Sequence, residues 1–113
     1  GKVNPDHYKG KVVIIINQTT QSFAEYHTMA FRTAPGATVI GSTTAGADGN
    51  VSKIVLPGGI ETMISGIGVY YPDGKETQRI GIVPDLEIKP TIKQIREGRD
   101  ELLEKAVEII EKQ

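Results

Sequence analysis

Residues 11–16 are predicted to form the first strand of the fold. The segment reads Lys-Val-Val-Ile-Ile-Ile, in which β-branched residues follow one another with no polar alternation. Such a run is typical of a central strand that is covered on both faces, as in a parallel sheet. After the polar residues 17–21, apolar residues at helical spacing predict a helix that ends at Pro35-Gly36. Four residues share its apolar face: Phe23, Ala30, Phe31 and Ala34.

The apolar segment 37–40 is predicted to be a second strand. Residues 11–40 then form one β-α-β unit, whose crossover is expected to be right-handed. In open sheets of this kind, ligands gather at the carboxyl ends of the strands because helix N-termini and free backbone N–H groups converge there. We therefore expect the chemistry of the chain in the loop that follows the first strand.

After residue 40 the pattern no longer predicts a β-α-β unit but a loop followed by antiparallel strands. Residues 41–50 are rich in glycine and small polar residues and are predicted to form a long loop. Strands are predicted at 52–56 and 61–71, on either side of a Pro-Gly-Gly turn, and a further turn is predicted at 72–75. This half of the chain is therefore expected to be antiparallel.

The last part of the chain is predicted to be mainly helical. After a brief strand at 86–88, a short helix at 91–97 begins with a capping box at Thr91 and is interrupted at Gly98. Asp100 can cap a terminal helix at 100–112. Its buried stripe is predicted to contain four residues: Leu103, Ala106, Val107 and Ile110.

Composition excludes several classes of function. The 113 residues are 38% apolar and 24% charged, which is ordinary for one small globular domain. Thirteen basic and fourteen acidic residues give a net charge of −1, so neither a nucleic-acid partner nor an anionic membrane surface is expected. The absence of cysteine excludes disulfides and thiolate zinc sites, and no apolar run reaches the roughly 18 residues of a membrane span.

No cofactor or metal is predicted. His7 and His27 lie 20 residues apart with no paired carboxylate pattern, which does not form a preorganised metal site. The glycine-rich residues 44–50 lack the lysine and the spacing of a phosphate-binding loop. The chain opens on Gly1 without an initiator methionine, and we expect it to be a piece of a longer protein.

Ser22 is the strongest candidate for chemistry. It stands at the entrance of the predicted helix, directly after a buried strand, where a hydroxyl is exposed and the first backbone amides point outward. An acyl-transfer nucleophile needs this placement. The residues from Ser22 to Glu25 also fit a capping box, in which the serine only holds the end of the helix. The residues alone leave both interpretations open.

An ordered set of segments within residues 8–89 resembles the C-terminal processing (tail-specific) serine peptidases. In that family a buried strand ends in Asn, and a Ser-x-Ser/Ala-Glu segment carries the nucleophile. The matching segments are Lys11-Val-Val-Ile-Ile-Ile-Asn17, Ser22-Phe-Ala-Glu25, Ala37-Thr-Val-Ile-Gly41, Thr44-Ala-Gly46, Leu56-Pro-Gly-Gly59, Tyr70-Tyr-Pro-Asp-Gly74 and Gly81-Ile-Val-Pro-Asp85.

The resemblance implies an α/β fold of the crotonase/ClpP-like kind, with a mixed sheet, a β-α-β unit, an antiparallel section and C-terminal helices. Residues 1–113 would be the C-terminal portion of a serine peptidase catalytic domain. Ser22 would attack the scissile carbonyl, and the backbone N–H of Phe23 would supply one oxyanion donor. The second donor would come from an upstream strand, so this chain alone is expected to be inactive, since losing one donor costs about a hundredfold to a thousandfold in rate.

The chain departs from the family at Ala47. Many bacterial members pair the serine with a lysine about 25 residues later, and that position here is Ala47. The nearest lysine, Lys53, fits a solvated strand position. The tricorn-core-like branch instead takes its base from a histidine earlier in its chain, which suits Ala47 better.

Neither histidine of this chain is expected to be the base. His27 lies five residues after Ser22 on the same helix and cannot reach back to its hydroxyl. His7 precedes the first strand and is separated from Ser22 by about 20 Å of extended chain. Tricorn-like enzymes also use an acidic residue from the later region, and among Asp48, Glu76 and Gln78 we take Glu76 as the candidate, although solvated surface is its commoner role.

The resemblance implies a peptidase that cleaves extended polypeptides through a seryl acyl-enzyme, with the substrate laid along a sheet edge. Two alternatives stay open: a catalytically inactive peptide-binding module of the same fold, favoured by Ala47, and a hydrolase of a non-peptide acyl substrate. A polypeptide is the expected partner, and sheet edges open the possibility of a homo-oligomer. The family resemblance suggests an exported protein of the periplasm or cell envelope.

Overall fold

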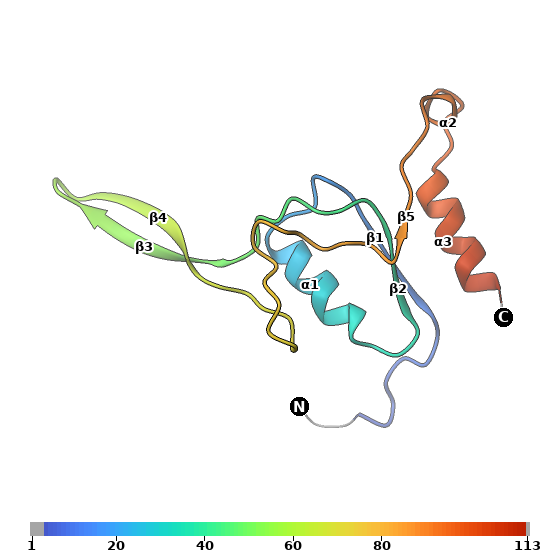
Figure 1. Ribbon diagram of the computed structural model, residues 1–113, viewed down its shortest axis with the longest axis horizontal. Coiled ribbons are helices and arrows are strands. Elements are labelled where there is room, and N and C mark those ends of the chain that lie inside the picture. The colour runs from blue at the N-terminus through green and yellow to red at the C-terminus, as the bar shows by residue number, and fades with distance from the viewer. Residues whose placement is uncertain (1–3, 113) are drawn as a thin grey trace.

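The computed structural model describes residues 4–112, so Gly1 lies outside the described part. Residues 4–112 form two sheets and three helices, and the hairpin sheet lies in the sequence between the second and third strands of the other sheet (Figure 1). The elements are β1 (Val12–Ile16), α1 (Phe23–Arg32), β2 (Ala37–Gly41), β3 (Asn50–Leu56), β4 (Ile60–Ile67), β5 (Leu86–Glu87), α2 (Ile92–Arg96) and α3 (Glu101–Glu111).

The parallel sheet has the strand order β1-β2-β5. The prediction of a parallel β-α-β unit is confirmed, since Val12 pairs with Ala37 and Ile16 pairs with Gly41. The prediction that the first strand is central is wrong for residues 4–112, because β2 takes that place and β1 lies at the edge. An apolar run shows that both faces of a strand are suited to burial, and it does not reveal how many neighbours the strand has.

Helices α1 and α3 flank the parallel sheet from opposite sides (Figure 1). Between α1 and the sheet lies a small core of Ile16, Met29, Val39 and Ile82. Thr91 and Asp100 cap α2 and α3, as predicted, by accepting hydrogen bonds from the N–H groups three residues later. The side chain of Lys11 donates to the backbone oxygens of Ile109 and Lys112 at the C-terminal end of α3, which holds the last helix on β1.

The apolar faces predicted for the helices are largely uncovered. On α1, Phe23 is 68% and Phe31 56% exposed, while the buried residues are Glu25, Thr28 and Met29. On α3, only Ala106 of the predicted stripe is buried, and Leu103 is 54% exposed. The predicted burial of these faces is therefore wrong within residues 4–112.

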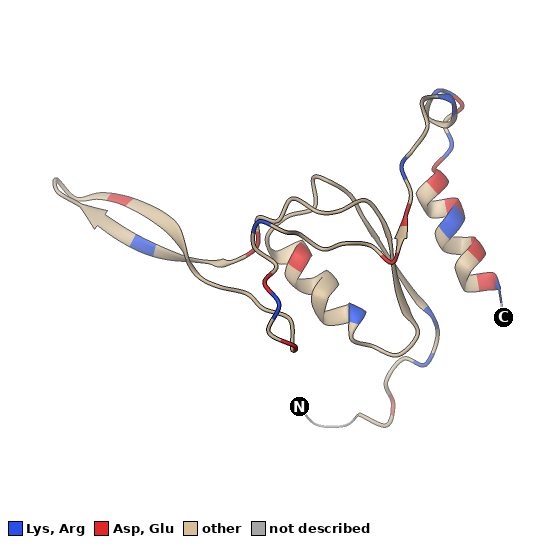
Figure 2. Cartoon of the chain, viewed as in Figure 1, with Lys and Arg blue, Asp and Glu red and all other residues tan. Residues whose placement is uncertain are grey.

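The antiparallel section is a hairpin, β3–β4, that extends away from the rest of the chain (Figure 1). β4 ends at Ile67, before the predicted limit of 71, and the chain then makes only an isolated bridge between Tyr70 and Glu76. Figure 2 shows few charges along the hairpin; Lys53 on β3 pairs with Glu61 on β4 at 3.7 Å. Several exposed apolar residues cover it: Val51, Val55, Leu56, Ile60, Met63, Ile64 and Ile67.

The described chain is extended for its length. Its radius of gyration is 17.7 Å, whereas a compact domain of this length would have about 13 Å. No helix within residues 4–112 is long and apolar enough to cross a bilayer. The small core and the many exposed apolar side chains mean that these residues bury little of the surface that normally stabilises a domain.

An ion pair joins the end of α1 to the segment that enters β5. The guanidinium of Arg32 pairs with Asp85 and also donates to the backbone oxygen of Val83 at 2.8 Å. The other carboxylate oxygen of Asp85 accepts the N–H of Val39 at 2.8 Å. Burial alone would raise the pKa of Asp85, but the hydrogen bonds from Val39 and Arg32 outweigh it and hold the pKa below its usual range.

This pair is expected to make the protein sensitive to acid. Because the folded pKa of Asp85 is depressed, its carboxylate contributes stability that is fully present above the unfolded pKa of about 4 and is lost as the pH falls through the folded pKa. Asp85→Asn should lower the urea midpoint at neutral pH and weaken its decline in acid. Glu61→Gln, on the exposed hairpin, is the control. An unchanged acid profile in Asp85→Asn would contradict this expectation.

Candidate active site

Ser22 lies between β1 and α1, at the carboxyl end of the parallel sheet. The loop that leads to it is held by Asn17, whose Oδ1 accepts the N–H groups of Thr19 and Thr20 at 3.0 and 3.1 Å. The carbonyl oxygen of Thr20 accepts the N–H of Ala45 at 2.9 Å, which joins this loop to the one after β2. Ser22 is therefore presented from a corner that hydrogen bonds fix on both sides.

The backbone of Ser22 is strained. Its φ of 54° and ψ of −125° lie in a region that L-residues rarely occupy and that glycine fills in type II′ turns. Such strain costs about 1–3 kcal/mol and persists only where the surrounding structure imposes it. The Ser22 hydroxyl is exposed and makes no hydrogen bond that caps the helix. The Glu25 half of the predicted capping box is present, because the Glu25 carboxylate accepts the Ser22 N–H.

Phe23 supplies a free backbone amide next to this hydroxyl. As the first residue of α1, its N–H has no acceptor among residues 4–112, whereas the next amides donate to Gln21 and Ser22. A free N–H at a helix N-terminus is suited to hold a developing negative charge. The free N–H of Phe23 and the side chain of Ser22 therefore belong to adjacent residues at the start of α1.

Ser22 opens onto a cavity of about 590 Å³. The loop after β2 contributes Asp48 and Gly49 to its wall, so two loops meet there; its lining residues are Ser22, Phe23, Tyr26, Asp48, Gly49, Asn50 and Val69. Asp48 is 6% exposed, and its carboxylate accepts the N–H of Gly49 at 2.7 Å and the hydroxyl of Thr77 at 3.4 Å. A buried carboxylate in the same cavity as the hydroxyl could orient a cationic group placed between them.

Glu25, one turn into α1, is completely buried. One carboxylate oxygen accepts the N–H of Ser22 at 3.0 Å, and the other accepts the N–H of Gly46 at 2.8 Å and the hydroxyl of Thr44. Glu25 has no cationic partner among residues 4–112, so backbone amides, a hydroxyl and the helix N-terminus satisfy it. The capping-box pattern in the sequence indicates the contact between Glu25 and the Ser22 N–H. Nothing in the sequence predicts the contacts of Glu25 with Thr44 and Gly46.

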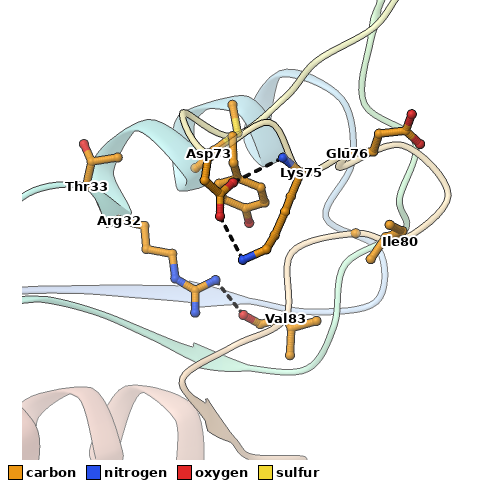
Figure 3. Close-up of a pocket in the computed structure, with 10 residues that line it drawn as sticks. Arg32, Thr33, Asp73, Lys75, Glu76, Ile80 and Val83 are labelled. Carbon is orange, nitrogen blue, oxygen red and sulfur yellow. Dashed lines mark hydrogen bonds and ion pairs between the residues drawn. The ribbon is translucent and has the colours of Figure 1, made fainter.

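Glu76 is not brought to Ser22. It lines a different cavity, of about 730 Å³, together with Arg32, Tyr71, Asp73 and Lys75. Figure 3 shows its carboxylate directed away from the ion pair of Asp73 and Lys75 in that cavity. The expected approach of Glu76 to the site is therefore not seen within the described chain.

Gln78 lies nearer to the Ser22 cavity. A Cβ added to Gly49, which lines the cavity, would come within 2.3 Å of the side-chain nitrogen of Gln78. Gln78 carries no ionisable group, so it does not fill the acidic role considered for this region.

The two histidines and Lys53, considered as bases for Ser22, make their polar contacts with groups other than the Ser22 hydroxyl. His27 bonds through Nδ1 to the backbone oxygen of Phe23 at 2.9 Å, and its ring packs edge-on against Phe23 at 4.1 Å. His7 bonds to the backbone oxygen of Asn4, and Lys53 lies on the hairpin. Ala47 is exposed beside Asp48. Neither histidine nor Lys53 lines the Ser22 cavity, as far as residues 4–112 are described.

Comparison with known proteins identifies the family. The sequence model described as Peptidase family S41 matches residues 2–88. A curated protein of Chlamydia trachomatis serovar D is 27% identical over 116 residues, which cover 96% of this chain and 19% of that protein.

Solved structures share the fold. A candidate peptidase of Parabacteroides merdae is 27% identical with a TM-score of 0.82, over 92% of this chain and 33% of that one. The tricorn protease, at 20% identity, has a TM-score of 0.76 over 96% of this chain and 12% of its own, a likeness of fold alone. The chain thus spans 19% of the curated relative and 33% of the Parabacteroides merdae protein. The resemblance to C-terminal processing peptidases is confirmed for the family: this chain belongs to peptidase family S41.

Proposed function

We propose that this chain carries the nucleophile of a serine peptidase. The observation that carries the proposal is the strained backbone of Ser22, beside the free N–H of Phe23 and open to a cavity. The Ser22 oxygen attacks the scissile carbonyl, its proton passes to a base, and the carbonyl oxygen becomes an oxyanion near the Phe23 amide. Collapse of this intermediate breaks the C–N bond, and the base passes its proton to the departing amine; the seryl ester left behind is then hydrolysed by water.

Base and second oxyanion donor are proposed to come from protein outside residues 4–112. In this proposal residues 1–113 are the C-terminal portion of a crotonase/ClpP-like catalytic domain and are inactive alone. The exposed apolar faces of α1, α3 and the hairpin support it, because a complete domain would bury such surfaces. A base that arrived at the cavity would meet the Asp48 carboxylate, which could hold its protonated form.

The substrate is proposed to be an extended polypeptide processed near its C-terminus, as the family resemblance implies. Backbone hydrogen bonds to a sheet edge would supply affinity with little dependence on side chains. An exported location follows from the same resemblance and is part of the proposal.

Active-site labelling tests this function. The full-length protein that contains this chain is treated with a fluorophosphonate probe, which reacts with activated serine hydroxyls. Labelling is expected in the wild type and is expected to vanish in Ser22→Ala, since alanine keeps the backbone but removes the nucleophile. Ser65→Ala, on the exposed hairpin strand β4, should keep the label.

Two results would contradict the proposal. Labelling that survives Ser22→Ala would place the reactive serine elsewhere. A wild type that is never labelled would favour the catalytically inactive peptide-binding module. Ala47 is the reason for considering that module, because it stands where many members of the family have a lysine.

A further inference from the structure

We propose that Glu25 and Thr44 form a buried relay that positions the Ser22 nucleophile by fixing its backbone against the loop formed by residues 77–82. This inference rests on the proposed function. Glu25 and Thr44 are positioning residues here, because neither of them lines the Ser22 cavity.

Glu25 holds the backbone of Ser22 from within the fold. Its carboxylate accepts the Ser22 N–H at 3.0 Å, and Ser22 itself lines the cavity. The strained φ of 54° needs an external restraint, and this hydrogen bond to a buried carboxyl oxygen provides one. It also occupies the Ser22 amide, which leaves the Phe23 amide as the free donor at this corner.

Thr44 extends the restraint to the opposite loop. Its hydroxyl donates to Glu25 and accepts the N–H of Ile82 at 2.7 Å, and its own N–H donates to the Ile82 carbonyl at 3.3 Å. Thr44 is 7% and Ile82 0% exposed, so these bonds lie in a low-dielectric interior where unpaired groups are costly. One hydroxyl thereby joins the nucleophile corner to the segment that carries Gln78 and Arg79.

Glu25 needs two acceptor oxygens because each of them serves a different partner. One faces the Ser22 N–H, and the other faces the Gly46 N–H. In Glu25→Gln, either orientation of the amide would point an NH₂ group at one of these N–H donors. No orientation satisfies both, and the restraint on Ser22 or on the β2 loop is lost.

The test compares Thr44→Val, Thr44→Ser and Glu25→Gln in the full-length protein. Valine has the shape of threonine but lacks the hydroxyl, whereas serine keeps it. Thr44→Val and Glu25→Gln are expected to slow acylation of Ser22 by a fluorophosphonate about tenfold to a hundredfold, as a small misplacement of reacting groups can. Thr44→Ser should restore most of the rate. Thr28→Val is the matched control, because Thr28 is buried on the same helix and its hydroxyl bonds only to Ala24.

A second readout separates positioning from chemistry. Hydrogen exchange of the Ser22 amide, followed by NMR, is expected to be slow in the wild type and Thr44→Ser, and faster in Thr44→Val and Glu25→Gln. Fast exchange already in the wild type would overturn the relay without any variant. The relay would also be overturned if a folded Thr44→Val protein were acylated at the wild-type rate although its Ser22 amide had lost protection from exchange. A wild type that is never acylated would instead refute the proposed function, and the relay's role in positioning a nucleophile with it.

Discussion

Replacing Ser22 with glycine is expected to abolish hydrolysis by the full-length protein and to increase its resistance to unfolding. Loss of the nucleophile of a serine peptidase costs on the order of 10⁴ to 10⁶ in kcat. At φ 54° and ψ −125°, glycine removes strain of about 1–3 kcal/mol from the folded state. The greater entropy of glycine in the unfolded chain lowers this gain in stability by about 0.5–1 kcal/mol. The urea midpoint and the turnover of a peptide substrate are the two measurements.

Ser22→Ala is the control that separates the two effects. Alanine removes the hydroxyl but keeps the Cβ that makes this conformation costly, so activity is expected to vanish without a gain in stability. If glycine and alanine gave the same urea midpoint, the strain attributed to Ser22 would not exist in solution. The comparison therefore tests the backbone geometry independently of the chemistry.

Gly41→Ala is expected to destabilise the parallel sheet strongly, by about 3 kcal/mol or more. Gly41 has a φ of 124°, and an added Cβ would lie 1.8 Å from the backbone oxygen of Ile16, its partner in β1. Backbone atoms cannot rotate away as a flexible side chain can, so the strands must separate where the loop to Ser22 begins. Loss of the thermal unfolding transition, or a large fall in its midpoint, is the expected measurement.

Gly58→Ala is the matched control for this change. Gly58 also has a positive φ, of 88°, but its Cβ would meet no atom within 4 Å. Its cost should be limited to the conformational penalty of about 1–2 kcal/mol. Equal effects at the two positions would show that the close approach of β1 and β2 at Gly41 is wrong.

The types of the elements could be predicted because periodicity and turn residues are local properties. The β-α-β unit, the hairpin and the two caps of α2 and α3 all follow from short stretches of sequence. The covered faces could not be predicted in this way. Phe23 and Phe31 fit a buried face by hydropathy, yet α1 buries Glu25, whose carboxylate accepts the Gly46 N–H of the β2 loop, and Thr28, whose hydroxyl donates to Ala24.

The candidate site was predictable in its centre and unpredictable in its surroundings. Ser22 was found from its place after a strand, but serine has no preference for positive φ, so its strain had no sequence signal. Asp48 and Glu76 were equivalent as acidic loop residues. Only the three-dimensional path of residues 42–49 brings Asp48 into the Ser22 cavity, while Glu76 follows a turn into another.

The long hairpin is also expected to make the isolated chain prone to aggregation. Each of its strands has one edge with unpaired N–H and C=O groups, and β3 contains the apolar segment Ile54-Val-Leu56, whose neighbouring charges are Lys53 and, across the hairpin, Glu61. Such ribbons nucleate cross-β stacking when nothing shields them. Preparations of residues 1–113 alone should therefore turn thioflavin-positive on storage, and a pair of lysines at positions 55 and 64 should delay it.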